Sequence, residues 1–247
     1  MKRRIRWYHL ESRGAPISRL VELMFAEQYT EDSGSGFQIY KSPKTSTAGS
    51  FIEKVKIEDV VEDPFGGILR FERVEFRKVG FKLFPSTRPN LEISDPPRSC
   101  KNFFMRIGAM LDHRVSVDPI QPDVRRWLAA LEKQIGKKVS VRAMALGGVA
   151  LSGSVSADVL VSGGVDVRKE ANALLNGRKA NVASVELFWQ QDGAELSCEL
   201  TRNGASYDEA TGEDMQRILR AALRESILEP LYDDVFHQGV EWMDRNG

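Results

Sequence analysis

The sequence predicts an α+β protein in which helices pack on one face of largely antiparallel sheets, arranged as two closely associated halves. Strand-like patterns dominate residues 51–84, and the 3.6-residue spacing of amphipathic helices recurs in several separate segments. The second half has the order helix, two strands, helix, two strands, helix, which is typical of helices layered on an antiparallel sheet. We therefore divide the chain into an N-terminal part, residues 1–120, and a C-terminal part, residues 121–247.

The N-terminal part begins with an alternating segment, Ile5–His9, that predicts a strand. Pro16 then stands where a helix prefers proline, in the first turn. The helix that follows has its apolar residues at helical spacing, namely Ile17, Leu20, Val21 and Met24. We expect a short strand at Phe37–Tyr40 and a polar loop over residues 41–50, which are rich in Ser, Thr and Lys.

Residues 51–84 form mostly strands on either side of an acidic turn at residues 58–63. The apolar residues change parity between Phe71 and Val74, which predicts a turn or bulge near Arg73 or Lys78. The side away from the apolar residues is expected to carry four cations, Arg70, Arg77, Lys78 and Lys82. A sheet with one basic face suits a polyanion, although many half-exposed sheets have the same pattern.

A helix is expected over Arg98–Leu111, because Asp95-Pro96-Pro97 is a good helix entry: a capping carboxylate followed by prolines. Its apolar residues would face inward, which leaves three cations for the outer side, Arg98, Lys101 and Arg106. A strand at Val115–Val117 then completes the N-terminal part.

The C-terminal part opens with a helix over Pro122–Ile135, which Gly136 ends. The expected strands and helix that follow are Val139–Leu146 and Leu151–Val161 joined through Gly147-Gly148, a helix at Asp166–Leu175, and a hairpin of Val182–Trp189 with Ala194–Leu200. A long helix begins after Thr211 and carries Arg217, Arg220 and Arg224 on its outer side. Residues 232–242 form a last amphipathic segment with a stripe of Tyr232, Phe236 and Trp242.

The charges are unevenly distributed, although 35 basic and 35 acidic residues give a net charge of zero. Residues 64–106 hold nine Lys or Arg and four Asp or Glu, a local excess of +5. Such an excess can bind phosphate or an acidic partner, and it is also common on solvated faces. Neither a zinc finger nor a helix-turn-helix pattern is present, so DNA binding here would be independent of sequence. The candidate DNA-binding residues are Arg70, Arg77, Lys78, Lys82, Arg98, Lys101 and Arg106, with Arg217, Arg220 and Arg224 as a second face.

No catalytic centre is predicted, and we expect neither a cofactor nor a bound metal. The three histidines lack metal spacing, and the glycine pairs lack the residues of a phosphate-binding loop. Cys100 lies near a helix start beside Arg98 and Lys101, which could lower its pKa, but packing against the sheet is the simpler interpretation. A metal-dependent nuclease built on Glu58, Asp59, Glu62 and Asp63 stays as an alternative, without the matching Glu-x-Lys element.

Binding of a protein in place of DNA is a second alternative. An adaptor or regulatory subunit of this kind would use the C-terminal aromatic stripe as its surface, although the same aromatic residues could pack on the body or form a dimer contact. No secretory signal or membrane-spanning stretch is recognisable, which favours a cytoplasmic location.

The ordered layout of the chain resembles that of the RexA family of phage superinfection-exclusion proteins. The features that carry the resemblance are a strand ending at Tyr8, Pro85-Ser86-Thr87 after a strand, Phe103-Phe104 on a helix, Val115-x-Val117-x-Pro119 before Asp123, and a long C-terminal helix. The correspondence covers most of the length, with few identical residues and no diagnostic motif.

The resemblance implies a homodimer that binds double-stranded DNA without sequence preference and acts in anti-phage defence, with a membrane protein as partner. It also implies an architecture similar to that of the ring-forming DNA-binding protein RdgC, and it offers no catalytic residues to carry over. The leading hypothesis is therefore a non-enzymatic, sequence-independent DNA-binding protein of the phage-exclusion kind.

Overall fold

The computed structural model describes residues 2–41, 45–152, 154–178, 180–191, 193–208 and 212–228. The chain separates into two compact units, which are described one at a time. Unit 1 comprises Met1–Gln121 together with Asn203–Glu209, and unit 2 comprises Pro122–Arg202 and Ala210–Gly247. The division by sequence placed all of residues 121–247 in the C-terminal part, whereas the short segment at 203–209 belongs to unit 1. Among the described helices, none combines the length and hydropathy needed to span a bilayer.

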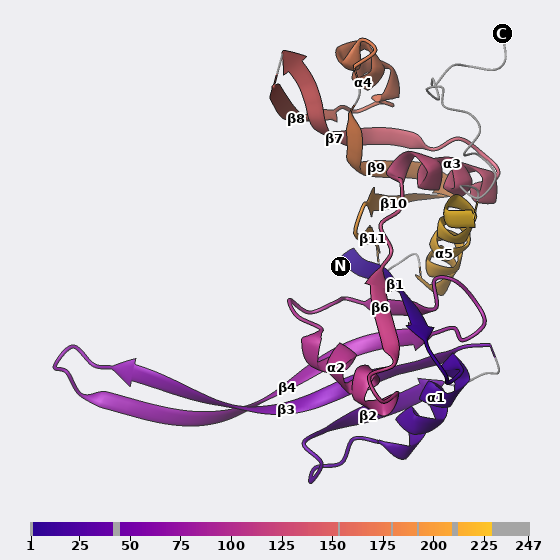
Figure 1. The fold of residues 1–247 in the computed structure, drawn as a ribbon. Helices are drawn as coiled ribbons and strands as arrows, with labels where there is room; N and C mark the ends of the chain where they lie inside the picture. Colours follow the sequence, from indigo (N-terminus) through magenta and orange to yellow (C-terminus); the bar gives the residue numbers. More distant parts are fainter. Residues whose placement is uncertain are drawn as a thin grey trace. The chain divides into compact units, whose positions relative to one another are not determined.

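Both units confirm the α+β class, because in each of them antiparallel strands pair with one another and helices pack against the strands (Figure 1). The elements of unit 1 are β1 (Lys2–Ser12), α1 (Ile17–Ala26), β2 (Ser35–Lys41), β3 (Thr47–Glu62), β4 (Ile68–Leu83), β5 (Leu91–Ser94), α2 (Lys101–Met110), β6 (Val115–Pro119) and β11 (Gly204–Asp208). The strand order in this unit is β2-β3-β4-β5-β1, and β6 and β11 also pair with β1.

The core of unit 1 lies between the sheet and the helices α1 and α2. Leu20 and Met24 of α1 and Phe103 of α2 are almost fully buried against Phe37 and Phe81 of the sheet. The ring centroids of Phe81 and Phe103 are 5.5 Å apart, so large aromatic side chains fill the space between the sheet and α2. The apolar stripes predicted for both helices therefore face the core.

The side chain of Asn90 takes the place of a strand residue beside β1. Its Oδ1 accepts from the Leu10 backbone N–H at 2.7 Å, and its Nδ2 donates to the Leu10 carbonyl at 2.8 Å. Asn90 is only 3% exposed, so both backbone groups of Leu10 would otherwise be buried without a partner.

The strand β11 enters unit 1 at a point where only glycine fits. Gly204 has a φ of 146°, and a Cβ atom placed on it would lie 2.0 Å from the carbonyl oxygen of Ile5. The chain can therefore approach β1 closely enough for Ala205 to pair with Ile5 in the antiparallel register. Nothing in the local sequence before Gly204 predicts this partner.

The elements of unit 2 are α3 (Val124–Ile135), β7 (Ser140–Ser152), β8 (Val155–Ser162), α4 (Arg168–Leu175), β9 (Asn181–Gln191), β10 (Ala194–Thr201) and α5 (Gly212–Leu228). Its strand order is β10-β9-β7-β8. Asp123 caps α3 by accepting from the backbone N–H groups of Arg125 and Arg126, which places the start of the helix just after the predicted Pro122. Gly136 ends the helix in the left-handed conformation, as predicted. Trp127 is buried and donates to the Leu219 carbonyl at 3.2 Å, which joins α3 to α5.

One predicted turn of unit 2 is wrong. Gly147-Gly148 was expected to join two strands, but β7 continues to Ser152. The register with β8 shifts between Leu146 and Val149, so the glycine pair forms a bulge inside the strand. The predicted aromatic stripe at 232–242 lies outside the described residues.

Candidate functional site

A long hairpin arm extends from the sheet of unit 1 (Figure 1). We define the arm as residues 54–76, in which β3 and β4 pair continuously from Lys54 opposite Phe76 to Glu62 opposite Ile68. The pairing of β3 with β2 ends at Glu53, and that of β4 with β5 begins at Gly80. Nine extended residues span about 30 Å. Two strands with no third strand beside them therefore project well beyond the core.

The expected bulge near Arg73 or Lys78 is absent, because the β3–β4 register contains no shift. The apolar residues change parity along a regular strand, so Leu69 and Phe71 lie on one face of the arm and Val74 and Phe76 on the other. Both faces of the arm are open to solvent, and no core selects one of them. The change of parity thus indicates that the strand has left the core of unit 1, and it does not indicate a distortion of the strand.

The arm is not basic, although the sequence of β4 suggested a basic face. Residues 54–76 contain four Lys or Arg and six Asp or Glu, a net charge of −2. The acids come mainly from the opposite strand, so that Arg70 contacts Glu58 at 3.0 Å and Arg73 contacts Asp59 at 2.7 Å. A third bridge joins Lys56 and Glu72 at 2.9 Å. Both arginines of β4 that lie within the arm are therefore paired with acids of β3.

The candidate cations of unit 1 do not share one face. Arg77 lies on the face of β4 that also bears Val79, whereas Arg70, Lys78 and Lys82 lie on the opposite face. On α2, Arg106 is engaged with Glu27 at 2.6 Å. The predicted single basic face is therefore wrong, because residues of odd and even number point to different sides of a regular strand.

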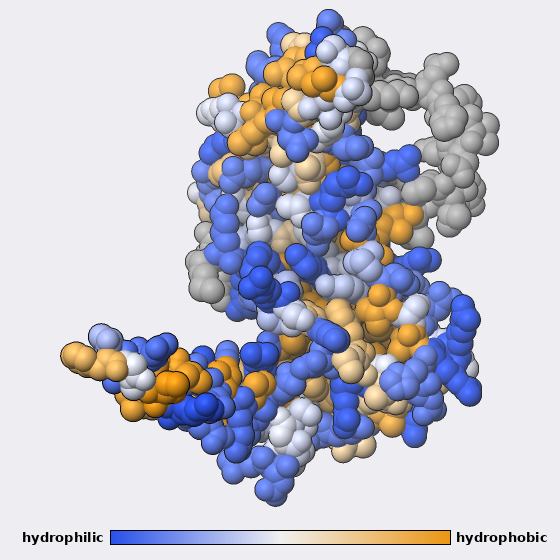
Figure 2. Space-filling model, turned by 60° about the vertical axis from the view of Figure 1, so that its left-hand side comes forward, coloured by the Kyte–Doolittle hydropathy of each residue, from blue (hydrophilic) through white to orange (hydrophobic). Residues whose placement is uncertain are grey.

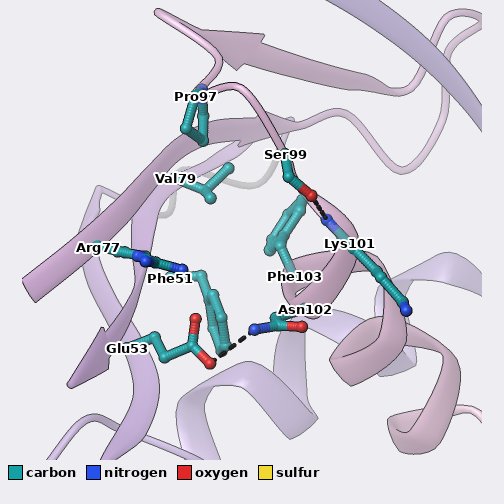
Figure 3. Close-up of a pocket in the computed structure, with 9 residues that line it drawn as sticks. All are labelled: Phe51, Glu53, Arg77, Val79, Pro97, Ser99, Lys101, Asn102 and Phe103. Atoms are coloured by element: carbon teal, nitrogen blue, oxygen red, sulfur yellow. Dashed lines mark hydrogen bonds between the residues drawn. The ribbon is translucent and has the colours of Figure 1, made fainter. Parts of the chain in front are cut away.

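Two of the predicted cations, Arg77 and Lys101, are among the residues that line a pocket at the root of the arm, although the side chain of Lys101 points away from Arg77 (Figure 3). Arg77 approaches it from β4 and Lys101 from the first turn of α2, and its volume is about 220 Å³. Asn102 donates to Glu53 at 2.7 Å on one wall. The remaining lining residues are Phe51, Val79, Pro97, Ser99 and Phe103. The exposed Arg98 belongs to the same loop as Pro97 and Ser99 but does not line the pocket.

The arm exposes apolar side chains along its length (Figure 2). Of the sixteen large hydrophobic residues that are exposed in the described chain, eight lie in the arm. They are Val60, Val61, Phe65, Ile68, Leu69, Phe71, Val74 and Phe76. Single exposed apolar residues are ordinary, but a cluster of this density indicates an interaction surface.

The turn at the tip of the arm holds one of these residues outward. Asp63 Oδ1 accepts from the backbone N–H groups of Phe65 at 2.7 Å and Gly67 at 2.9 Å, which closes the turn. Phe65 between them is 97% exposed. Because the backbone around it is ordered by these bonds, the ring is displayed from a defined position.

The four acids of the alternative nuclease site are separated by the strand geometry. Glu58 and Asp59 point to opposite faces of β3, each with an arginine partner, and Asp63 is used by the turn. Within the described part of the chain, no group of three or more His, Cys, Asp or Glu is placed to hold a metal ion.

The environment of Cys100 does not suit a nucleophile. Burial raises the pKa of the Cys100 thiol, and the charge of Arg6 only partly offsets this effect. Cys100 packs beside the core of unit 1, and Cys198 is 3% exposed with its pKa also raised by burial. Both thiols are free, as the packing interpretation predicts.

In unit 2, the predicted cations of α5 lie at its surface to different degrees. Arg217 is exposed and bridges to Asp214 at 2.9 Å, Arg224 is exposed, and Arg220 is half-buried. The inward residues of the helix, such as Leu219 and Leu223, are fully buried. The amphipathic pattern therefore predicts the orientation of the helix.

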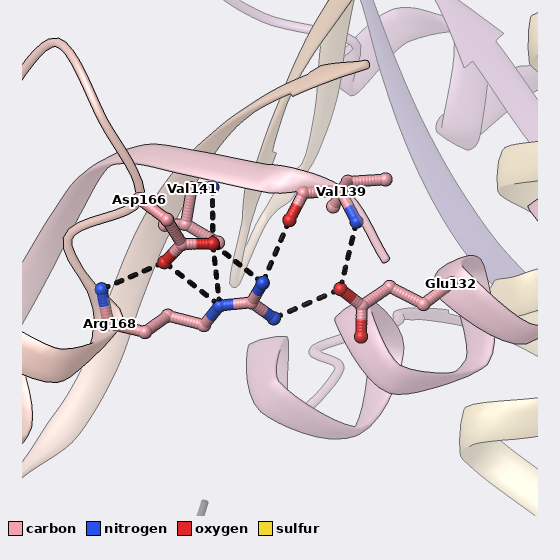
Figure 4. Close-up of polar contacts among 5 residues, drawn as sticks. All are labelled: Glu132, Val139, Val141, Asp166 and Arg168. Carbon is pink, nitrogen blue, oxygen red and sulfur yellow. Dashed lines mark hydrogen bonds and ion pairs between the residues drawn. The ribbon is translucent and has the colours of Figure 1, made fainter. Parts of the chain in front are cut away.

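Sequence reasoning missed the most extensive polar network of unit 2, which is centred on Arg168 (Figure 4). Its guanidinium bridges to Asp166 at 2.6 Å and Glu132 at 2.9 Å and donates to the Val139 carbonyl at 2.8 Å. Glu132 in turn accepts from the Val139 N–H at 3.0 Å. The network joins α3, the start of β7 and the loop before α4.

Comparison with known proteins adds no assignment: no protein-family model matches the chain, and no curated protein matches its sequence.

Proposed function

We propose that this protein acts by binding another protein through the arm and that it is not an enzyme. The single observation that carries the proposal is the concentration of exposed apolar residues on a projecting two-stranded ribbon. Protein–protein contacts draw on such residues, and aromatic side chains such as Phe65 and Phe71 supply much of the binding energy when they are buried in a complex.

The charges of the arm support a protein partner. The arm has a net charge of −2 and its arginines already face carboxylates, so a polyanion would gain little from it. Ion pairs of this exposed type contribute little to stability, but they keep an otherwise apolar ribbon compatible with water.

The experiment is a comparison of two variants that remove the same number of exposed apolar side chains. One carries Phe65→Ser, Leu69→Ser and Phe71→Ser on the arm, and the matched control carries Val155→Ser, Leu160→Ser and Val165→Ser in unit 2. The wild type and the two variants are each tagged and used to capture partners from a lysate of the expressing cells, to which untagged chain has been added. The captured proteins are measured by quantitative mass spectrometry. We expect only the arm variant to lose captured proteins; equal capture by all three would refute the proposal.

A second candidate function is the sequence-independent binding of double-stranded DNA at the root of the arm. The observation that favours it is the placement of Arg77 and Lys101 on one pocket, with Arg98 in the adjoining loop. Among the described residues, Lys101 and Arg98 have no carboxylate within ion-pair distance, so their charges are available to phosphates. This location would suit the phage-exclusion role, with a homodimer and a membrane partner, that the resemblance implies.

Its test is the binding of a fluorescent random-sequence duplex at several salt concentrations. Arg77→Ala with Lys101→Ala should weaken binding equally for all sequences and reduce the slope of log affinity against log salt by about 0.9 for each phosphate that the variant no longer neutralises. The matched control, Arg217→Ala with Arg224→Ala, removes the same charge from α5. If the wild type fails to bind at low salt, the DNA hypothesis is wrong; if the control loses affinity instead, α5 is the binding face.

A further inference from the structure

The outer edge of β4 is open along the whole arm. Between Ile68 and Val79 no described strand pairs with β4 on the side away from β3, because β5 joins it only from Gly80. Unpaired edges present rows of backbone N–H and C=O groups that can pair with another strand. Proteins usually protect such edges with proline or a bulge, and β4 contains neither between these residues.

The side chains along this edge are complementary to a second copy of themselves. When two β4 strands lie antiparallel about a two-fold axis at Phe71, Arg70 of each copy lies opposite Glu72 of the other, and Ile68 lies opposite Val74. Phe71 then meets Phe71. Opposite charges and apolar pairs placed directly across from one another stabilise antiparallel strands, whereas like charges oppose pairing.

Neighbouring registers lack this match. An axis at Arg70, Glu72 or Arg73 sets two identical charges directly opposite each other. An axis at Val74 brings Arg70 opposite Lys78. A two-fold axis passes through a directly opposed pair of identical residues, so each possible register is defined by the residue at the axis. Among the five registers with the axis at a residue from Arg70 to Val74, the register centred on Phe71 is the one that places no like charges opposite each other.

We propose that two copies of this chain associate by edge-to-edge pairing of their β4 strands, centred on Phe71, to form a four-stranded sheet from two arms. The inference rests on the proposed protein-binding function of the arm and names its partner. Each charged residue at the axis keeps its bridge within the arm, Arg70 with Glu58 and Glu72 with Lys56, and gains a second partner from the other copy. The pairing thereby satisfies the open backbone groups of both edges.

The test uses the full chain and charge reversals whose effects should cancel on mixing. Sedimentation velocity of the wild type should show a dimer. Arg70→Glu alone and Glu72→Arg alone place like charges opposite each other twice in the dimer, so each should weaken self-association on the order of tenfold or more. An equimolar mixture of the two variants restores opposite charges at both positions and should form a mixed dimer of wild-type affinity.

The control is Arg217→Glu, which changes the charge by the same amount as Arg70→Glu but lies on the exposed side of α5 in unit 2 and outside the arm. This variant should remain dimeric. A defect in folding cannot produce the expected pattern, because mixing two misfolded proteins does not restore assembly. A wild type that is monomeric at about 100 μM would overturn self-association, while loss of captured partners from the arm triple variant would still uphold the protein-binding function. A dimer that persists in both single variants, or a mixture that stays monomeric, would overturn the β4 register.

Discussion

Arg73 on β4 donates from Nε to Oδ2 of Asp59 on β3 at 2.7 Å, so an arginine of the basic central segment is neutralised by an acid fourteen residues earlier in the chain. The same holds for Arg70 and Glu58. Positive charge concentrated in one stretch of sequence therefore does not become a positive surface when the neighbouring strand carries the complementary acids.

The Arg73–Asp59 pair should add little to stability despite its short distance. Both side chains are about half exposed, and exposed ion pairs contribute about 0–1 kcal/mol. We expect a double-mutant cycle of Arg73→Ala and Asp59→Ala, measured by urea unfolding, to give a coupling free energy below about 1 kcal/mol. A larger coupling would show that the arm is stabilised by charge more than its exposure indicates.

Asn90 should be far more important for stability than its size suggests. Asn90→Ala leaves the buried N–H and C=O of Leu10 without partners, and each unsatisfied group costs about 1–3 kcal/mol. The free energy of unfolding should fall by about 2–4 kcal/mol. Asn102→Ala is the control, because it removes only an exposed hydrogen bond to Glu53 and should change stability by less than about 1 kcal/mol. Equal effects of the two substitutions would contradict this interpretation.

The Arg168 network should make unit 2 sensitive to acid. Burial alone would raise the pKa of Asp166, but the hydrogen bonds and charge of Arg168 outweigh it and lower the pKa. A lowered pKa in the folded state contributes stability that is complete above the ordinary pKa of about 4 and is lost as the pH falls through the folded value. In Asp166→Asn, unfolding free energy should therefore depend less on pH below about pH 4. If the unfolding free energy of the variant depended on pH below about pH 4 as strongly as that of the wild type, other carboxylates would dominate the acid sensitivity.

Removing the cation at the centre of this network should be costly at neutral pH. Arg168→Met keeps much of the side-chain volume but leaves Glu132 and the Val139 carbonyl, both at the edge of the core, without their shared donor. We expect a loss of about 2–4 kcal/mol in unfolding free energy by chemical denaturation. Arg217→Met removes a bridge between two exposed side chains and should cost less than about 1 kcal/mol.

Much of the helical framework could be predicted from local patterns. Leu20 and Met24, Phe103 and Ile107, and Leu219 and Leu223 all face inward as their spacing predicts, because a helix presents one stripe to whatever covers it. The ends of α3 follow from Asp123 and Gly136, since helix capping depends on residues within one turn of the end.

The candidate site could be predicted only in part. The sequence placed Arg77 and Lys101 among the cations, but which cations share a surface depends on strand parity and on the helix that packs beside β4. The sequence predicts a sheet with one apolar face for this segment, because Leu69, Phe71, Val74 and Phe76 have the composition of buried strand residues, whereas all four are exposed on the arm. A parity change without glycine or proline was the one signal of a strand exposed on both faces.

By itself, the sequence determined the α+β class, the apolar stripes of the helices and most strand positions, because these depend on periodicity and on capping residues a few positions apart. The tertiary structure alone decided which strands lie side by side: Asp59 beside Phe71, Gly204 against Ile5, and an arm that leaves the body beyond Glu53. Gly204 and Ile5 come from segments far apart in the chain, and Asp59 and Phe71 come from the two opposite strands of the hairpin. The pairing of strands determines which charges neutralise one another and which apolar residues remain exposed. Local sequence patterns do not predict this pairing.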